Sequence, residues 1–213
     1  MNKRQRLMLL NALLVCALSA PALADKSCQQ TPQGPLCLSQ VRFDAFAQRV
    51  YEPQYQSQWC WAACISMLFR YYGHPVSQQR IVSEVYGVPA NMPAMAGIVM
   101  ARQLNRRWVD DNGNAFTSQV TAAYDFDARV NNVTNAWLAS ELNQNHPIVI
   151  GTGSHAVVVT AMQYYDTPVG PNVVSVGVFD PWPYVGARGL TPNEMRPMHL
   201  GGALRFVATV RIS

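Results

Sequence analysis

Residues 58–65 read QWCWAACI, and the apolar run that they begin stops at Gly73, with Pro75 beyond it. A glycine after the last apolar residue and a proline beyond it are a helix end signal, so the run predicts a helix over residues 59–72. Cys60 would lie in its first turn. There the positive end of the helix dipole favours the thiolate, which is the nucleophilic form of cysteine. The stretch therefore predicts an apolar helix that presents a cysteine nucleophile.

Two later residues can complete such a site. His155 follows the flexible residues 151–154 and opens an apolar strand, and Asp180 ends the next strand, 25 residues further on. An imidazole can pair with a thiolate and later protonate a leaving amine, and a carboxylate on the other ring nitrogen fixes the orientation of the ring. We therefore interpret Cys60, His155 and Asp180 as the nucleophile, the acid/base and the orienting carboxylate of a cysteine hydrolase.

The remaining pattern changes from helical to strand spacing along the chain. Turn residues and apolar periodicity predict helices over residues 59–72, 78–86, 93–104 and 134–143, a hairpin at Asn112-Gly113, and strands over residues 147–151, 155–164, 172–179 and 203–212. Ser77 is the expected cap of the second helix, and Gly87 its end. Helices followed by an antiparallel sheet make an α+β fold.

At these segments the sequence resembles the papain-like cysteine peptidases. The closest likeness is to bacterial peptidases that trim double-glycine leaders and to secreted cysteine-protease effectors of plant pathogens. The shared motifs are Gln54, CWAA at residues 60–63, HAVVV at residues 155–159 and DPW at residues 180–182. The resemblance implies an N-terminal helical lobe that carries the nucleophile helix and a C-terminal antiparallel sheet lobe that carries His155 and Asp180.

The resemblance also assigns Gln54. A papain-like oxyanion hole uses a side-chain amide six residues before the nucleophile together with the nucleophile's own backbone N–H, and Gln54 stands six residues before Cys60. Gln58 stands at the same spacing before Cys64, but a position inside the helix suits Cys64 better as a small buried apolar residue. We therefore assign Cys60 as the nucleophile. Trp182 matches the indole that covers the histidine of such sites.

Papain-like enzymes commonly have asparagine where this chain has Asp180. In a resting thiolate and imidazolium pair both ring nitrogens carry protons, so an amide oxygen can accept a hydrogen bond as a carboxylate does. The sequence alone therefore predicts that Asp180→Asn keeps much of the activity, whereas Asp180→Ala loses considerably more.

Residues 1–24 have the features of an export signal. Lys3, Arg4 and Arg6 precede an apolar run over residues 7–18, and a small-residue site, ALA, ends at residue 24. We expect cleavage there, a secreted or periplasmic location, and a peptidase domain over residues 25–213. The apolar run is shorter than the ~20 residues of a membrane span, so we expect no membrane contact after cleavage.

Charge and ligand spacing predict what the protein does not bind. The formal net charge of +4 falls to +1 once the three basic residues of the signal are removed, which leaves 13 basic and 12 acidic residues. This balance does not favour nucleic acid. Cys60 and Cys64 with distant histidines are a poor match to metal-ligand spacing, so no metal or other cofactor is expected. The expected partner is a protein or peptide substrate.

Cys28 and Cys37 bracket the turn-rich residues 29–36, and an exported protein meets an oxidising environment, so we predict a disulfide between them. The alternative pairs one of them with Cys64. Other single residues have simpler expectations: a surface location for His74, His146 and His199, and a core location for Trp59, Trp61, Trp108 and Trp137.

Three function classes remain open from the sequence: an endopeptidase, an amidase that cuts peptide cross-bridges of the cell wall, and a catalytically silent binding module. The presence of all four residue types of the site favours an active enzyme. The sequence does not determine the scissile bond, the biological target or the oligomeric state. It also leaves open whether residues 25–50 are a pro-segment, since neither they nor residues 185–213 match a motif.

Overall fold

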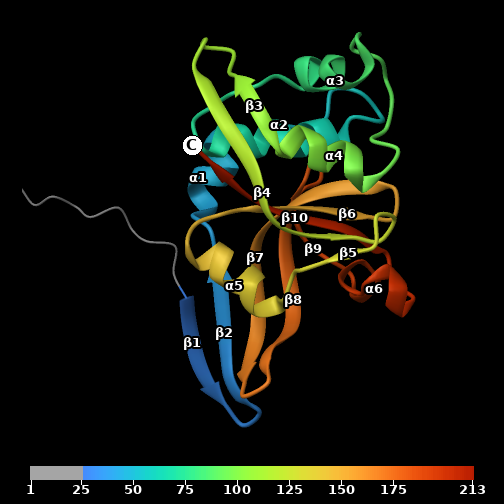
Figure 1. Ribbon diagram of the computed structural model, residues 1–213. Helices are drawn as coiled ribbons and strands as arrows, with labels where there is room; N and C mark the ends of the chain where they lie inside the picture. Colours follow the sequence, from blue (N-terminus) through green and yellow to red (C-terminus); the bar gives the residue numbers. More distant parts are fainter. Residues whose placement is uncertain (1–25) are drawn as a thin grey trace, which may run out of the picture.

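The computed structural model describes residues 26–213, so the expected signal peptide and its cleavage site lie outside the described residues. The helices are α1 (Phe43–Arg49), α2 (Cys60–Tyr71), α3 (Gln78–Tyr86), α4 (Gly97–Leu104), α5 (Asn135–Asn143) and α6 (Pro192–Met195), with a 3₁₀ turn at Met198–Leu200. The strands are β1 (Lys26–Thr31), β2 (Gly34–Gln40), β3 (Arg106–Val109), β4 (Ala115–Asp125), β5 (Val130–Asn131), β6 (Ile148–Thr152), β7 (His155–Thr167), β8 (Gly170–Asp180), β9 (Gly186–Gly189) and β10 (Leu204–Ile212). Helices α1 to α4 gather at one end, and the long strands β2, β7 and β8 extend away from them (Figure 1).

The strands form one antiparallel sheet, in the order β1-β2-β7-β6-β10-β4-β3, with β8 and β9 continuing from β7. Strand β7 is its centre. It pairs with β8 along one edge, and along the other edge with β6 near its start and with β2 near its end. The mixture of helices and an antiparallel sheet confirms the α+β class.

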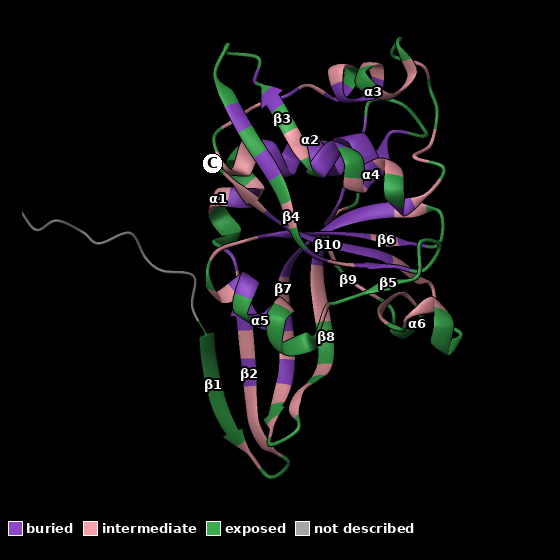
Figure 2. Cartoon of the chain, in the orientation of Figure 1, coloured by how far each residue is buried: buried purple, intermediate pink, exposed green. Residues whose placement is uncertain are grey.

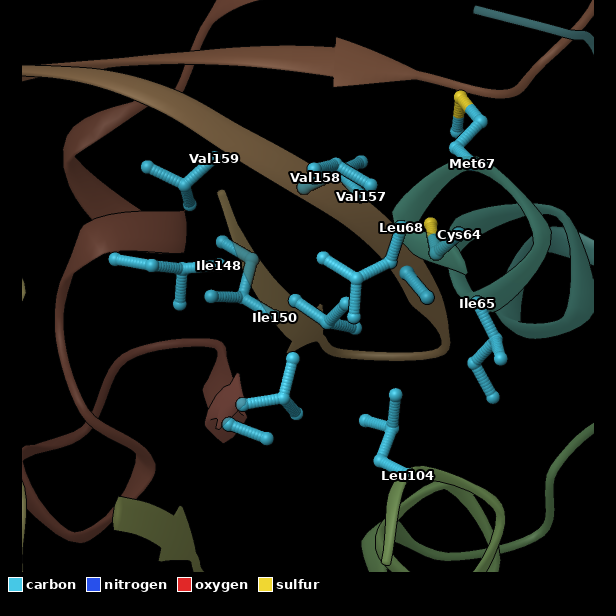
Figure 3. Packing of buried hydrophobic residues seen from close by; sticks show 14 of the residues in the cluster. Cys64, Ile65, Met67, Leu68, Leu104, Ile148, Ile150, Val157, Val158 and Val159 are labelled. Atoms are coloured by element: carbon cyan, nitrogen blue, oxygen red, sulfur yellow. The ribbon is translucent and has the colours of Figure 1, made fainter. Parts of the chain in front are cut away.

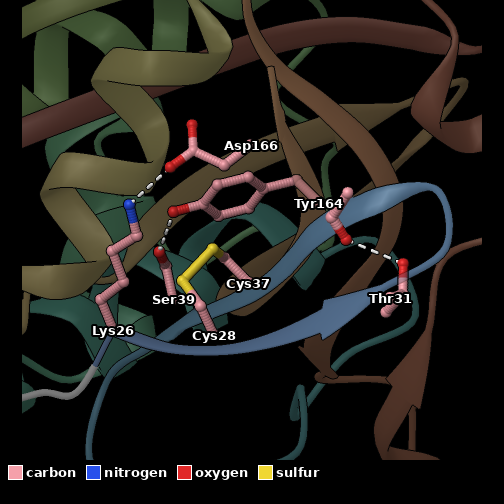
Figure 4. Close-up of a disulfide and its surroundings, with 8 residues drawn as sticks. Lys26, Cys28, Thr31, Cys37, Ser39, Tyr164 and Asp166 are labelled. Carbon is pink, nitrogen blue, oxygen red and sulfur yellow. Dashed lines mark hydrogen bonds and ion pairs between the residues drawn. A yellow bond between two sulfur atoms is a disulfide. The ribbon is translucent and has the colours of Figure 1, made fainter. Parts of the chain in front are cut away.

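The order of elements differs from the prediction at the N-terminus, because a β-hairpin precedes the helices. Strands β1 and β2 continue the sheet beyond β7, so residues 26–40 of the N-terminal segment without a motif belong to the sheet lobe. Cys28 and Cys37 lie directly opposite each other in the hairpin and form the predicted disulfide. Figure 4 shows it beside Tyr164, whose hydroxyl lies 3.1 Å from Ser39 Oγ. Only β1 of this pair is exposed along its length (Figure 2), since β2 is covered by its neighbours.

Helix α2 is buried on all sides over its first ten residues, as expected for a helix that is apolar around its whole circumference. Leu68 of α2 faces Val157 and Val158 of β7, and Leu104 of α4 completes this part of the core (Figure 3). The helix ends where the sequence predicts, because Gly73 adopts a φ of 87°, a conformation that favours glycine. Its position is therefore fixed by packing against both the sheet and the other helices.

Helices α3 and α4 differ from the prediction in detail. Ser77 stands at the N-cap of α3, but its side chain makes no capping hydrogen bond, and its backbone N–H donates to Asp111 Oδ2 at 2.8 Å. Helix α4 begins at Gly97 and not at Pro93. The residues before it are not helical, and Met95 has a φ of 60°, outside the helical range. Two carbonyls of this segment accept side-chain donors: the Trp61 indole donates to Met92 O at 3.1 Å, and the Tyr86 hydroxyl donates to Pro93 O.

Two of the three histidines expected at the surface are partly buried beside carboxylates. His74 Nδ1 lies 3.1 Å from Asp110 Oδ2, and the His74 side chain is 26% exposed. His146 Nδ1 lies 3.3 Å from Glu141 Oε2. His199 is exposed, as expected. The surface expectation was wrong for His74 because its partner Asp110 lies 36 residues away in the sequence, and for His146 because the end of a helix brings Glu141, five residues earlier, back to it.

Three of the four tryptophans expected in the core are buried: Trp59, Trp61 and Trp108. Trp137 is the exception, with 39% of its surface exposed and its indole N–H donating to Thr209 Oγ1 at 3.1 Å. Among residues 26–213, no helix has the length and apolar character that a membrane crossing needs.

Gly97 carries a stability prediction. A Cβ at this position would lie 2.5 Å from Phe206 Cδ2 and 2.6 Å from Asp125 Oδ2, and both of these side chains are buried. The clash should outweigh the better helix propensity of alanine, so Gly97→Ala should lower the free energy of unfolding by about 1–3 kcal/mol. Gly189→Ala is the matched control, because nothing lies within 4 Å of its added Cβ. Urea denaturation of the two variants decides it, and equal stability would contradict the close approach of α4 to β10.

Candidate active site

Cys60 is the first residue of α2, and it faces a cleft of about 240 Å³. The first helical hydrogen bond after it runs from the Ala63 N–H to the Trp59 carbonyl at 2.9 Å, so the helix geometry provides no partner for the Cys60 N–H. Cys60 is 9% exposed, whereas Cys64 is completely buried. Burial raises the pKa of the Cys64 thiol well above its usual value, and the proximity of Cys60 and Asp180 adds to this. Both burial and the raised pKa disfavour the thiolate form of Cys64.

His155 reaches the cleft through a tight hairpin. Strands β6 and β7 are joined by Gly153 and Ser154, with Thr152 opposite His155 in the register. Gly153 has a φ of 60°, as the first central position of a two-residue hairpin turn requires, and glycine adopts this value without strain. The glycine-containing residues 151–154 thus form a tight turn, and this turn positions His155 at the start of β7.

Asp180 lies beside His155 because β8 runs antiparallel to β7, with Phe179 opposite Val158. Asp180 Oδ1 is 2.6 Å from His155 Nε2, and the same oxygen accepts the Trp182 backbone N–H at 2.8 Å. Since the Nε2 of His155 is hydrogen-bonded to Asp180, Nδ1 is the ring nitrogen available to interact with Cys60. The structure thus brings together Cys60, His155 and Asp180.

The electrostatics of the pair favour charged forms. Burial lowers the pKa of His155, but the hydrogen bond to Asp180 and the neighbouring Cys60 outweigh it and raise the pKa to about 9. Burial raises the pKa of Asp180, but the hydrogen bonds from His155, the Trp182 N–H and Arg188 outweigh it and lower the pKa. At neutral pH the site therefore holds an imidazolium hydrogen-bonded to a carboxylate.

Gln54 is close to the site but does not point a free donor into the cleft. Its backbone N–H donates to Pro181 O at 2.7 Å, which ties it to the segment after Asp180. Its side-chain Nε2 donates to the carbonyls of Gln56 and Ser57, each at 2.9 Å. Within the described residues its buried Oε1 has no hydrogen-bond partner. The Gln54 amide can donate to an oxyanion only if it breaks its hydrogen bond to one of these two carbonyls.

Gln58, the second candidate by spacing, is exposed, and its backbone N–H donates to Asn91 Oδ1 at 3.0 Å. The indole of Trp182 lies beside the His155 ring, as the resemblance implies. Its ring meets that of His155 edge-on with centroids 6.2 Å apart, and the residue is 49% exposed. The backbone of Trp182, and not its indole, makes the contact with Asp180.

The cleft has four walls. They come from the start of α2 (Cys60, Trp61), the segment before α4 together with α4 itself (Pro93, Ala94, Met95, Ala96, Gly97, Met100), the β6–β7 hairpin (Gly151, Gly153, Ser154, His155, Ala156) and β10 (Arg205, Phe206). Most of these residues are small or apolar. In the part of the chain that the structure describes, no group of three or more His, Cys, Asp or Glu side chains could hold a metal ion.

Two residues of the site went unnoticed in the sequence. Arg188 of β9 donates from Nε to Asp180 Oδ2 at 2.8 Å, and Glu194 of α6 binds the other end of the guanidinium. The sequence does contain a signal for Glu194, since Thr191 and Glu194 have the spacing of a capping box, which the structure shows. No local signal connects Arg188 to Asp180, because that contact depends on the pairing of β8 with β9.

Comparison with known proteins gives one family. A family model described as the Peptidase_C39 like family matches residues 43–196. The chain is also similar to the peptidase domain of Streptococcus ComA, described as a bifunctional ABC transporter involved in a quorum sensing pathway, with 15% identity and a TM-score of 0.40 over 76% of this chain and 96% of that one. No curated protein matched. Since the family model covers more than half of the sequence, the chain belongs to the Peptidase_C39 like family and is a cysteine peptidase.

Proposed function

We propose that this protein is an exported endopeptidase that hydrolyses peptide bonds with Cys60 as nucleophile, His155 as acid/base and Asp180 as orienting carboxylate. One observation carries the proposal. An imidazolium with a pKa of about 9, hydrogen-bonded to Asp180 at 2.6 Å, lies beside the first residue of a buried helix at the edge of a cleft. A thiolate at a helix N-terminus beside an imidazolium is the resting state of a cysteine nucleophile.

The chemistry follows from these positions. The Cys60 thiolate attacks the scissile carbonyl carbon, a C–S bond forms, and the carbonyl oxygen takes the charge. His155 transfers a proton to the amide nitrogen, the C–N bond breaks, and the amine leaves a thioester. The imidazole, now neutral, takes a proton from water as the water attacks the thioester. The C–S bond then breaks, which releases the carboxylic acid and restores the thiolate and imidazolium pair.

We assign the oxyanion to two donors. The Cys60 backbone N–H is left free by the helix geometry, and it lies on the residue whose sulfur attacks. The side-chain amide of Gln54 is the proposed second donor. For this role the amide must turn one N–H away from the Gln56 or Ser57 carbonyl and toward the cleft. The unpaired Oε1 supports this assignment, since a buried amide oxygen without a partner leaves the present orientation poorly stabilised.

Export is supported by two features. Residues 1–24 have the pattern of a signal peptide, and the disulfide between Cys28 and Cys37 suits an oxidising compartment. The mature protein would then act in the periplasm or outside the cell. Expression in a secreting host followed by N-terminal sequencing tests this proposal: a mature chain that begins at Asp25 supports it, and an uncleaved chain in the cytosol contradicts it.

The decisive experiment measures the reaction itself. Purified residues 25–213 are incubated with a peptide library and, separately, with cell-wall muropeptides, and the cut bonds are identified by mass spectrometry. Peptide cleavage that disappears in Cys60→Ala supports the endopeptidase. Cleavage of muropeptides alone would replace it with a wall amidase. No cleavage of either substrate class by a folded protein whose Cys60 is fully reduced would favour the silent binding module.

A first prediction concerns thiol reactivity. Iodoacetamide at mildly acidic pH should label Cys60 well ahead of Cys64, because Cys64 is completely buried and its pKa is raised. Cys28 and Cys37 should stay unlabelled until the disulfide is reduced. Peptide mapping gives the order, and the urea-unfolded protein, in which the two free thiols should react alike, is the control. Faster labelling of Cys64 in the folded protein would reverse the assignment of the nucleophile.

A second prediction separates the two glutamines. Gln54→Ala should lower kcat by ~10²–10³ with a smaller change in KM, because an oxyanion donor acts mainly in the transition state. Gln58→Ala is the matched control and should change kcat far less, since its side chain is exposed. Because Gln54 also holds two backbone carbonyls, circular dichroism must show that the variant is folded. Equal losses in the two folded variants would remove Gln54 from the oxyanion hole.

A third prediction concerns alkaline pH. The pKa of His155 is raised from 6.5 to about 9, so the imidazolium persists through neutral pH. The stability that this charge contributes is fully present below pH 6.5 and is lost as pH rises through about 9. We expect kcat/KM to fall in the same alkaline range. Asp180→Ala should move that limb to lower pH, because it removes the hydrogen bond that raises the pKa. An unchanged alkaline limb in the variant would show that Asp180 does not control the imidazole.

A further inference from the structure

The carboxylate of Asp180 accepts three hydrogen bonds from three different parts of the chain. Oδ1 accepts from His155 Nε2 at 2.6 Å and from the Trp182 backbone N–H at 2.8 Å. Oδ2 accepts from Arg188 Nε at 2.8 Å. The Asp180 side chain is only 6% exposed, so solvent does not replace a partner that is lost. Both oxygens therefore act as acceptors toward a positively charged side chain.

Arg188 is held in place by its own partners. Its two terminal nitrogens, Nη2 and Nη1, donate to Glu194 Oε1 at 2.8 Å and Oε2 at 3.1 Å, which leaves Nε for Asp180. Glu194 is fixed in turn, because its Oε2 accepts the Thr191 backbone N–H at 2.8 Å in the capping box of α6. The pairing of β8 with β9 places Arg188 opposite Val178, two residues before Asp180 and therefore on the same face of the sheet.

We propose that Arg188, anchored by Glu194, is a positioning residue for Asp180 and makes this site require a carboxylate where an amide would otherwise serve. The proposal rests on the proposed function, in which Asp180 orients His155. The two charged partners of Asp180 are both hydrogen-bond donors, the imidazolium on one oxygen and the guanidinium on the other. It goes beyond the triad because Arg188 touches neither the substrate nor the thiol.

The two sides of Asp180 both need an acceptor. A carboxylate accepts on both oxygens, whereas an amide has one oxygen and one NH₂ group. If the new amide of Asp180→Asn turned its oxygen toward His155, its NH₂ would face the Arg188 Nε–H, and the reverse orientation would set its NH₂ against the His155 Nε2–H. One donor is left facing another donor in a buried place, which is destabilising because no water can satisfy either group. The expectation from the sequence, that Asp180→Asn keeps much of the activity, is therefore replaced by the opposite one.

The charges of the network agree with this role. The carboxyl of Glu194 has its pKa lowered to about 2 by the hydrogen bond from Arg188, so Glu194 stays ionised through most of the acid range and continues to hold the guanidinium. Two cations, His155 and Arg188, then alternate with two anions, Asp180 and Glu194, and buried charges persist when they are paired in this way. Among the described residues, Tyr51 and Cys64 are further titratable groups near Asp180, and Cys60 lies beside its partner His155.

The test is a comparison of Asp180→Asn in two backgrounds, the wild type and Arg188→Met, with kcat/KM for a cleaved peptide as the readout. In the wild-type background we expect Asp180→Asn to lose nearly as much activity as Asp180→Ala. Arg188→Met alone should lose about 10- to 100-fold, as is typical of residues that orient a functional side chain. In the Arg188→Met background, Asp180→Asn should recover at least about tenfold over Asp180→Asn alone, because the competing donor is gone.

The pH profile gives a readout that a purely structural role would not change. Arg188→Met removes a positive charge beside Asp180 and His155, so both limbs of the profile of kcat/KM should move to higher pH. Arg188→Lys keeps the charge and should keep both limbs near their original pH while losing part of the rate. Glu194→Gln serves as a second variant if Arg188→Met does not fold. It loosens the guanidinium and should lower kcat/KM while raising the relative activity of Asp180→Asn.

Arg211→Met is the matched control. Arg211 also donates to a buried carboxylate through two nitrogens, with Nη2 at 2.9 Å from Glu141 Oε1. It lies six residues along β10 from Arg205, which lines the cleft. Six strand residues span ~20 Å. This variant should lose stability without a change in the pH profile or in the effect of Asp180→Asn.

Two results would overturn the proposal: equal activity of Asp180→Asn in both backgrounds, or limbs that stay in place in Arg188→Met. Either can occur while Cys60→Ala and His155→Ala abolish cleavage, in which case the peptidase function stands and only the role of Arg188 fails. Cleavage that survives in Cys60→Ala would instead reject the proposed function itself. The two failures are therefore distinguishable in one set of variants.

Discussion

The hydrogen bond between His155 and Asp180 depends on the pairing of two strands, and most of the fold keeps that pairing in register. Strand β7 begins with the histidine and β8 ends with the aspartate, so only the antiparallel alignment of Val158 with Phe179 brings the two side chains together. Burial of α2 against β7 then sets Cys60 at the same end of the sheet. The ionised pair is stable in this half-buried place because each charge has a charged or backbone partner within hydrogen-bond distance.

Local signals in the sequence were sufficient for the parts of the structure that short segments determine. The apolar run ending at Gly73 predicts α2 to within a residue, and the Asn112-Gly113 signal predicts the hairpin of β3 and β4. The Cys28–Cys37 disulfide also follows from a short turn-rich segment. The residues at the start of α2, the start of β7 and the end of β8 were recognisable because each stands at an element boundary, which is where reactive side chains reach a cleft.

Contacts between distant segments were not predictable from these signals. The place of β1 and β2 at the edge of the sheet depends on their pairing with the far half of β7, which no local pattern encodes. Helix α4 begins later than predicted, after Met95 adopts a φ of 60° that lies outside the helical range. Arg188 is the same kind of case. Its sequence neighbours carry no motif, and its role arises only when β9 pairs with β8 and α6 presents Glu194.

The residues after Asp180, which form β9 and α6, stabilise its carboxylate. A triad with an amide at the orienting position needs only one acceptor, and its surroundings can be neutral. A carboxylate buried at that position brings a second oxygen that must also be satisfied, and a charge that must be balanced. Strand β9 and helix α6 supply both, since Arg188 satisfies the second oxygen and Glu194 balances the arginine. The choice of aspartate over asparagine at position 180 is thus connected to the fold of the residues that follow it, and not only to the chemistry of the histidine.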